Sequence, residues 1–343
     1  MPSKHRGTGG AHRREKGVTT PPRRTSQQAD SPIRTPDTLL RRARYLRSRR
    51  LRMTDPPCAS FDIVTTLAGV GRRGKKDGDL VSAYFDRPWD VCALGDGSVL
   101  VTDSTNNMLR RVCRRTQTVT TLRTTASFLA PRSPIRLGGS AIAVLDSGHN
   151  KVRRLKLATN HELGGVVVEQ ETTVAGCGRR GHKDGRPECA MFNQASGLCL
   201  AADGAILVAD TGNHAIRRIG PLRGKTGLWV TTLVGEPGVP GFEDGHNRNA
   251  RLNRPTALAV DACGTIVVCD TANHSVRVLH PPIDDVGPWT LTTVAGSGAP
   301  GFVDGEGSSA QFHFPSSVCI DQVGLGGGPW SCCLHAASPP KSF

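Results

Sequence analysis

Four pairs of Asp and Arg recur along the chain with the same separation. In each pair the Arg follows the Asp by seven residues: Asp103 and Arg110, Asp146 and Arg153, Asp210 and Arg217, and Asp270 and Arg277. An Asp and an Arg that face each other across a hairpin form charge-assisted hydrogen bonds, which stabilise the turn between them. A catalytic group is normally needed once, whereas this pair recurs in every copy. We therefore interpret all eight as structural residues, and we expect the chain to have no catalytic residue and not to be an enzyme.

Histidines recur in the same motif and raise the question of a metal site. His214 and His274 follow the Asp by four residues, His149 lies one place earlier in its copy, and Asn107 replaces His in the first copy. Several His residues around one mouth of a repeat domain could bind zinc. These residues alternate with Asn, however, and no Asp or Glu accompanies them at a separate spacing. We expect them to belong to the turn, and we expect neither a metal site nor a cofactor.

A second repeated motif forms Gly-rich loops of contrasting charge. The copies GRRGKKDG (71–78), GRRGHKDG (178–185), GVPGFEDG (238–245) and GAPGFVDG (298–305) share one frame. None ends in the Gly-Lys-Ser/Thr of a nucleotide-binding loop. The side chains that we interpret as candidate binding residues are Arg72, Arg73, Lys75, Lys76, Arg179, Arg180, His182, Lys183, Phe242 and Phe302. Their basic and apolar sectors could bind RNA or an acidic peptide, although a merely solvated surface is the alternative. No aromatic residue interleaves the basic loops, which weakens the case for stacking of nucleic-acid bases.

The strands that must position these residues also repeat. The phrases VTTLAG (64–69), VTTLR (119–123), TTVAG (172–176), TTLVG (231–235) and TTVAG (292–296) predict one strand per repeat. The residues around each Asp and Arg predict a strand, a polar turn and a second strand, because Ile, Val and Leu lie on both sides of turn-forming residues. With the apolar segment after each Gly-rich loop, a repeat contains four antiparallel strands, which we name a, b, c and d in chain order. Serial four-stranded units predict an all-β propeller.

The motifs of residues 61–321 resemble the NHL repeat. The match rests on D-[ST]-x-N-H-x-[IV]-R after an apolar strand, on TTVAG, and on the GFxDG loop, which is similar to that of teneurin-type NHL propellers. The resemblance implies a scaffold that contacts partner proteins through its loop faces. Some relatives bind RNA through basic faces, and the amidating lyases of the family bind zinc. RNA binding, through the basic tail and loops, and a metal-dependent lyase or hydrolase activity are therefore the alternatives.

The net charge of +15 is concentrated in the first part of the chain. Residues 1–57 contain 15 Lys and Arg against 4 Asp and Glu, and they have few aliphatic clusters. We expect a disordered basic tail over 1–57, a propeller over 58–323, and a non-repeat, unstructured segment over 324–343. The tail is interpreted as a solvated segment, a nuclear-import or phosphate-binding patch, or an organelle presequence. No apolar run could span a membrane, and the 11 Cys contain no CxxC pair, so we expect a cytoplasmic or nuclear protein.

The number of strands predicts an incomplete ring. We expect an opening strand d at 63–68, four blades of which the second is degraded, and a closing strand a at 316–321. The last blade then lacks its b–c hairpin, since 324–343 has no strand pattern. A truncated or frameshifted C-terminus, a second chain that completes the propeller, and an open domain are the three explanations.

Overall fold

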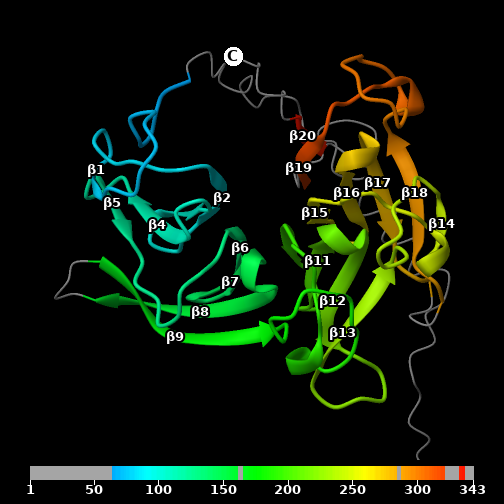
Figure 1. The fold of residues 1–343 in the computed structure, drawn as a ribbon, viewed down its shortest axis with the longest axis horizontal. Coiled ribbons are helices and arrows are strands. Elements are labelled where there is room, and N and C mark those ends of the chain that lie inside the picture. Colours follow the sequence, from blue (N-terminus) through cyan, green and yellow to red (C-terminus); the bar gives the residue numbers. More distant parts are fainter. Residues whose placement is uncertain (1–63, 161–164, 284–286, 321–331, 337–343) are drawn as a thin grey trace, which may run out of the picture. The chain divides into compact units, whose positions relative to one another are not determined.

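The computed structural model describes residues 64–160, 165–283, 287–320 and the backbone of 332–336. Their secondary structure is almost entirely antiparallel β-sheet, arranged as four successive blades (Figure 1). The fold class predicted from the sequence, an all-β propeller, is therefore confirmed. The tail predicted for residues 1–57 lies outside the described residues.

Each blade contains strands a to d in sequential order. Blade 1 comprises β2 (Pro88–Ala93), β3 (Val99–Asp103), β4 (Met108–Cys113) and β5 (Thr118–Thr121). Blade 2 comprises β6 (Pro131–Gly138), β7 (Ala141–Asp146), β8 (Lys151–Asn160) and β9 (Gly165–Ala175). Blade 3 comprises β10 (Gly197–Leu200), β11 (Ile206–Asp210), β12 (Ala215–Pro221) and β13 (Leu228–Val234). Blade 4 comprises β15 (Ala257–Val260), β16 (Ile266–Asp270), β17 (Ser275–His280) and β18 (Thr290–Ala295).

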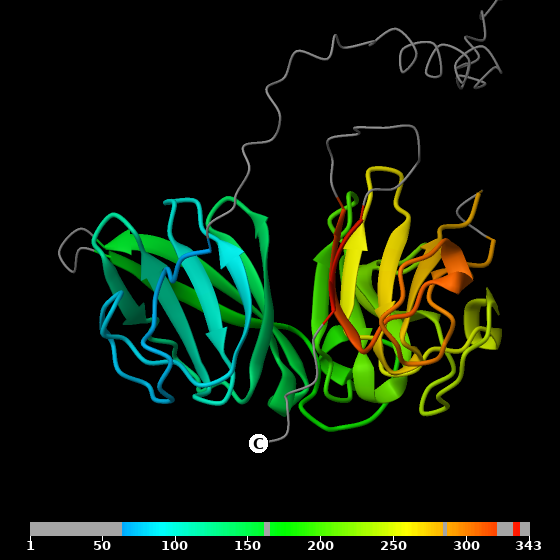
Figure 2. The same cartoon turned by 90° about the horizontal axis from the view of Figure 1, so that it is seen from above.

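Short elements complete the blades. The strands β1 (Gly78–Asp79) and β14 (Gly245–His246) pair with β5 and β18, so two Gly-rich loops each add a fifth strand to the outer edge of their own blade. Within the described ranges, short 3-10 helices lie in the connections: η1 (Ser147–His149), η2 (Pro187–Cys189), η3 (Thr211–Asn213), η4 (Asn247–Asn249), η5 (Thr271–Asn273) and η6 (Gly307–Ser309). β19 (Pro315–Ile320) follows blade 4 and pairs with β20 (Cys332–Ala336). Figure 2 shows β19 beside the strands of blade 4.

The turn between strands b and c is built the same way in every blade. The fourth residue after the Asp has a positive φ, between 51° and 59°, in every blade. These residues are Asn107, Asn150, His214 and His274. Asn tolerates this left-handed conformation better than most residues, and a single such residue reverses the chain tightly. The polar phrase after each Asp therefore closes the hairpin and fixes the register of strand c against strand b.

Apolar side chains from adjacent blades pack against each other. Leu145 and Val152 of blade 2 share one cluster with Phe192 and Val208 of blade 3. A corresponding cluster joins Ile216 of blade 3 to residues of blade 4, and another joins blades 1 and 2. Because alternate residues of a strand point to opposite faces, the continuous apolar run of strand b supplies both contacts, as Val208 and Leu207 of β11 do.

Two boundary predictions differ from the structure. The phrase at 63–68, expected to be an opening strand d, forms no strand over its described residues 64–68. Over 324–343, which we expected to be unstructured, β20 pairs antiparallel with β19. Both differences have one physical basis. Strand formation depends on an available neighbour with unpaired N–H and C=O groups, and sequence pattern does not report that neighbour.

The described residues contain no helix that is long and apolar enough to cross a membrane.

Candidate functional site

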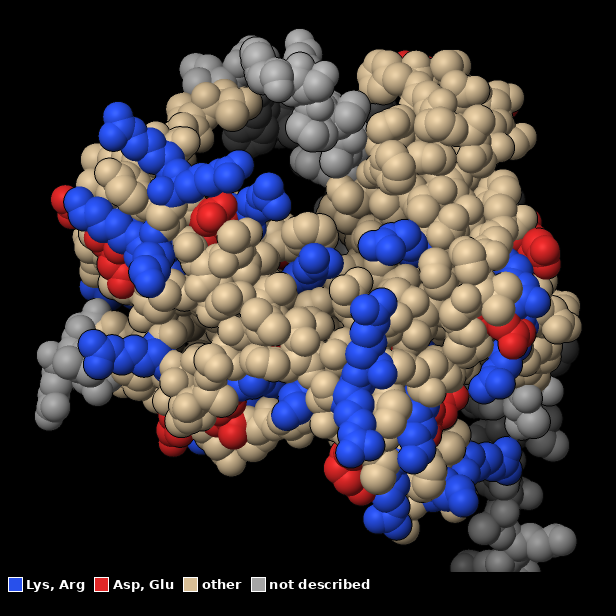
Figure 3. Space-filling model, viewed as in Figure 1, with Lys and Arg blue, Asp and Glu red and all other residues tan. Residues whose placement is uncertain are grey.

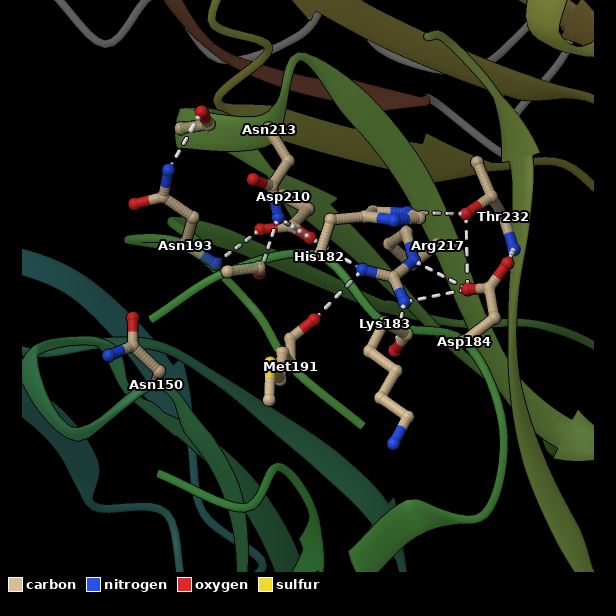
Figure 4. Close-up of polar contacts among 12 residues, drawn as sticks. Asn150, His182, Lys183, Asp184, Met191, Asn193, Asp210, Asn213, Arg217 and Thr232 are labelled. Carbon is tan, nitrogen blue, oxygen red and sulfur yellow. Dashed lines mark hydrogen bonds and ion pairs between the residues drawn. The ribbon is translucent and has the colours of Figure 1, made fainter. Parts of the chain in front are cut away.

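The most elaborate polar site in each blade surrounds the Arg of strand c. In blade 3 the guanidinium group of Arg217 is completely buried, and Figure 4 shows its partners. Its Nη1 donates to Asp210 Oδ2 at 2.7 Å and to the carbonyl oxygen of Met191 at 3.1 Å. Its Nη2 donates to Asp184 Oδ1 at 2.7 Å and to the carbonyl oxygen of Lys183 at 3.0 Å, and Nε donates to Asp184 as well. The charge is therefore neutralised and its donors are engaged by protein atoms.

The pairing recurs in the other three blades. Arg110 Nη1 lies 2.9 Å from Asp103 Oδ2, Arg153 Nη2 lies 2.5 Å from Asp146 Oδ2, and Arg277 Nη1 lies 2.7 Å from Asp270 Oδ2. The second oxygen of each Asp accepts a backbone N–H from the segment before strand a, as from Asn193 to Asp210 at 2.8 Å. We call the buried Arg with its carboxylate and carbonyl partners the arginine site of its blade. It joins strands b and c to the preceding loop.

Sequence reasoning did not single out the second carboxylate of the arginine site. Asp77, Asp184 and Asp244 are the Asp residues of the Gly-rich loop motif, and each contacts the Arg that follows it by 33 residues. Each also accepts hydrogen bonds from the second Thr of the strand d phrase, as Asp184 does from the N–H and Oγ1 of Thr232 at 3.1 Å. The recurrence of Asp-Gly in all four loop copies was the available signal. The loop Asp therefore links strand d to the Arg of strand c through hydrogen bonds.

Blade 2 has no Gly-rich loop, and a different residue takes the place of the loop Asp. Glu171 of β9 contacts Arg153 Nη1 at 2.5 Å and accepts hydrogen bonds from Thr125. The carboxylate thus comes from strand d itself rather than from a preceding loop. The repeat that appeared degraded in sequence keeps the arginine site by this replacement.

A Phe ring packs against each buried Arg. Phe85, Phe128, Phe192 and Phe242 place their ring centroids 4.8–5.2 Å from the Cζ atoms of Arg110, Arg153, Arg217 and Arg277. In blade 4 the ring comes from the Gly-rich loop, because Leu252 stands where blades 1 and 3 have Phe. Phe242, a candidate binding residue from the sequence, is therefore partly used inside its own blade.

The strand b carboxylates of these sites are fully buried, whereas the loop carboxylates are partly exposed. Burial raises the pKa of Asp210 and raises that of Asp270 to about 6, while the adjacent Arg opposes the rise in both cases. Removing the Arg would leave such a carboxylate without its counter-charge, which is far more costly than removing an exposed ion pair.

The turn after strand b also holds neighbouring blades together. The side chains of Asn107, Asn150, His214 and His274 accept hydrogen bonds from the backbone N–H of Ala130, Gln194, Arg254 and Phe314, each in the following repeat. The hydroxyls of Ser104, Ser147, Thr211 and Thr271 donate to carbonyl oxygens there as well. The residue equivalent to His214 in blade 2 is thus Asn150, while His149 contacts Asp146 at 2.9 Å.

Burial lowers the pKa of both turn histidines, with Arg254 adding to the effect at His214 and His313 adding to it at His274. A neutral ring is what the contact requires, since Nδ1 accepts a hydrogen bond from a backbone N–H. Within the residues that the structure describes, no three His, Cys, Asp or Glu side chains gather so that they could hold a metal ion.

The remaining candidate residues of the Gly-rich loops occupy different environments. The side chains of Arg72, Arg73, Lys75, Lys76, Arg179, Arg180 and Lys183 are exposed. His182 is half-buried, its Nε2 lies 2.9 Å from Thr232 Oγ1, and burial lowers its pKa to about 4. Phe302 is 95% exposed, whereas Phe242 is 41% exposed. Figure 3 shows Lys and Arg gathered over blades 1 and 3.

These blades, their a-to-d topology and their arginine sites define the class of protein as a β-propeller. The family model described as the NHL repeat matches residues 85–110, 192–219 and 252–279, which span strands a to c of blades 1, 3 and 4. The chain therefore contains NHL repeats in these three blades. The matched ranges do not include blade 2, where Glu171 replaces the loop Asp. The resemblance to teneurin-type propellers stays a prediction.

The curated relatives are larger than this chain. It is 25% identical over 298 residues to NHL repeat-containing protein 2 of Gallus gallus, in a match that covers 76% of this chain and 40% of that protein. It is 29% identical over 241 residues to Protein SUPPRESSOR OF QUENCHING 1, chloroplastic, of Arabidopsis thaliana, covering 63% and 22% of the two chains. The match thus spans less than half the length of either relative.

The fold also occurs among solved structures. An auxiliary nutrient binding protein from Bacteroides thetaiotaomicron superposes with a TM-score of 0.52 and 16% sequence identity, over 71% of this chain and 56% of that one. At this identity the likeness concerns the fold alone.

Proposed function

We propose that this chain is a non-enzymatic protein-interaction module that binds partner proteins through exposed loops of its blades. The proposal is supported by what the recurring polar side chains bind. The Asp and Arg of the repeats bind each other within a blade, and the Asn and His bind backbone N–H groups of the next blade. The side chains that differ between blades are instead the exposed ones of the Gly-rich loops, and surface loops on a rigid scaffold commonly carry binding function.

The basic loops of blades 1 and 3 are the surface that we propose for contact. Arg72 and Arg73 are exposed, and Arg179 and Arg180 occupy the equivalent positions in blade 3. Such a surface favours a partner with an acidic segment, because positive charges at exposed positions steer oppositely charged partners. RNA is the second candidate for the same loops, supported by the same exposed charges.

A quantitative affinity capture with the full chain distinguishes these proposals. The R72S/R73S variant is compared with R114S/R115S, which removes two exposed Arg from the c–d turn of the same blade. A set of proteins that is lost with R72S/R73S, kept with R114S/R115S and insensitive to RNase supports protein binding. Loss of the same set on RNase treatment favours RNA, and equal capture by all variants contradicts both proposals.

The compartment is part of the same proposal. We infer an intracellular location, cytoplasmic or nuclear, with organelle targeting by the Arg-rich N-terminal residues as the alternative. Support comes from Cys92 and Cys199, which are partly buried at equivalent positions in strand a, where a thiol serves as a small apolar group. Microscopy of the full chain and of a chain lacking residues 1–57 tests the inference.

A further inference from the structure

A fifth blade begins at β19 in the same manner as the other blades. Thr271 Oγ1 donates to the carbonyl oxygen of Pro315 at 2.7 Å, and the N–H of Phe314 donates to His274 Nδ1 at 3.2 Å. These contacts repeat those of Thr211 with Pro255 and of His214 with Arg254 between blades 3 and 4. β19 therefore stands in the position of strand a.

The carbonyl and carboxylate groups of an arginine site are already assembled beside β19. In blade 4, the carbonyl oxygens of Glu243 and Arg251 and the carboxylate of Asp244 bind Arg277. Glu243 and Arg251 also hydrogen-bond each other, with N–O distances of 3.5 and 3.0 Å.

In the Gly-rich loop at 298–305 and the segment before β19, the equivalent residues are Val303, Asp304 and Gln311. The same reciprocal hydrogen bonds join Val303 and Gln311, at 3.3 and 2.9 Å. Over the described part of the chain, no Arg contacts this set. Phe302 stands where Phe242 packs against Arg277, yet Phe302 is 95% exposed. The acceptors of an arginine site are therefore present, but no described residue supplies the guanidinium group that would bind them.

β20 stands in the place of strand b but lacks its Asp. In blades 1 and 2 the Pro that begins strand a pairs with the Asp of the arginine site, as Pro88 does with Asp103 and Pro131 with Asp146. Pro315 pairs instead with Ala336. β20 therefore supplies a backbone for β19 but no carboxylate for an incoming Arg.

Residues 65–69 show the complementary feature at the other end of the described chain. The N–H of Gly69 donates to the carbonyl oxygen of Leu80 at 2.8 Å, as Gly176 does to Pro187 and Gly296 to Gly307. This is the contact by which strand d of one blade ends on the next blade. A Cβ atom at Gly176, Gly235 or Gly296 would lie 2.4–2.6 Å from the carbonyl oxygen of the left-handed turn residue. At Gly69 the described residue within 4 Å of a Cβ atom is Phe85. Among the described residues, none supplies a b–c turn beside Gly69.

We propose that the fifth blade position binds a b–c hairpin of the NHL type from a second polypeptide, with an Asp that is followed seven residues later by an Arg. The Arg enters the set formed by Val303, Asp304 and Gln311, and the Asp accepts the N–H of His313, as Asp270 accepts that of Asn253. Charge complementarity supports this occupant, since an Asp carboxylate and two carbonyl oxygens match the donors of a guanidinium group. The hairpin replaces β20. This site is separate from the basic loops of blades 1 and 3.

The probe for this site is a fluorescent synthetic peptide with the sequence of residues 264–280, the b–c hairpin of blade 4. Its anisotropy is measured with the full chain, under reducing conditions, beside a peptide in which Arg277 is replaced by Lys. We expect the Lys peptide to bind about tenfold or more weakly, because Lys keeps the charge but loses the fork of donors.

Protein variants place the binding at Asp304. D304N should weaken binding of the Arg peptide about tenfold, whereas the neighbouring E306Q, with the same change in charge, should leave it unchanged. L334P removes an N–H from β20 and should strengthen binding, because β20 then competes less. Equal affinities for the Arg and Lys peptides, equal effects of D304N and E306Q, or weaker binding by L334P would each overturn the proposal.

Discussion

His214 Nδ1 accepts a hydrogen bond at 3.1 Å from the backbone N–H of Arg254, which lies 40 residues further along and in the next blade. A ring nitrogen can accept this bond only while it is unprotonated. The equivalent contact of His274 with Phe314 has the same requirement. In blades 1 and 2 an Asn oxygen makes the contact, so the sequence itself offers a substitute that does not titrate.

The H214N/H274N variant should therefore be less sensitive to acid than the natural chain. The pKa of each His is lowered from its ordinary value of 6.5 in the folded state, so the unfolded state takes up protons first as the pH falls. The stability of the natural chain is fully present above pH 6.5 and decreases as the pH falls towards the lower folded pKa. The loss is roughly 1.4 kcal/mol per His for each unit of pKa lowering.

Urea unfolding at pH 7.5 and at several values below 6.5 measures this difference. The two proteins should differ little at pH 7.5, and the variant should gain relative stability below pH 6.5. H280N, at an exposed position, is the control. A constant difference between the variant and the natural chain at every pH would contradict the role assigned to these histidines.

Replacing Arg217 by Met should destabilise the fold strongly. The change leaves Asp210, which is fully buried, without its counter-ion, and such removal costs about 3–5 kcal/mol. The neighbouring R218M breaks the more exposed pair with Asp203 and should cost about 1 kcal/mol or less. Chemical denaturation of both variants provides the measurement, and equal losses would argue against the arginine site as the main polar support of the blade.

Glu171 should matter more for stability than Glu169, although both are acidic residues of β9. E171Q weakens the contact with Arg153, a nearly buried group, and should cost about 1–3 kcal/mol. E169Q weakens only the exposed pair with Lys156 and should change stability by less than about 1 kcal/mol. Thermal unfolding of the two variants decides whether Glu171 serves blade 2 as the loop Asp serves the other blades.

Gly235 should tolerate no side chain, because of both its backbone conformation and its surroundings. Its φ is +97°, and a Cβ atom would lie 2.4 Å from the carbonyl oxygen of His214. Gly238 has a φ of +77°, but nothing lies within 4 Å of its Cβ position. G235A should therefore lower the free energy of unfolding clearly more than G238A, by about 1 kcal/mol or more beyond the backbone strain that both share. Similar losses of stability in the two variants would show that backbone strain alone accounts for the presence of Gly at position 235.

Much of the blade could be predicted from residue spacing, because the determinants of a hairpin are local. The seven-residue separation of Asp210 and Arg217 brings both to one face of an antiparallel pair once the turn has formed, and the apolar strands on either side are evident from their composition. The repetition of that segment was sufficient to indicate a propeller of four-stranded blades.

Contacts between distant segments could not be predicted in this way. Asp184 reaches Arg217 across 33 residues because its loop turns back along the outer edge of its own blade, and Glu171 replaces the loop Asp from a different strand. His214 gave no local sign that its partner is the N–H of Arg254. Even the strand at Cys332–Ala336 depends on a free edge of β19 rather than on its own pattern. Periodicity reports which face of a strand is buried, but the partner on that face depends on where the folded backbone brings another segment.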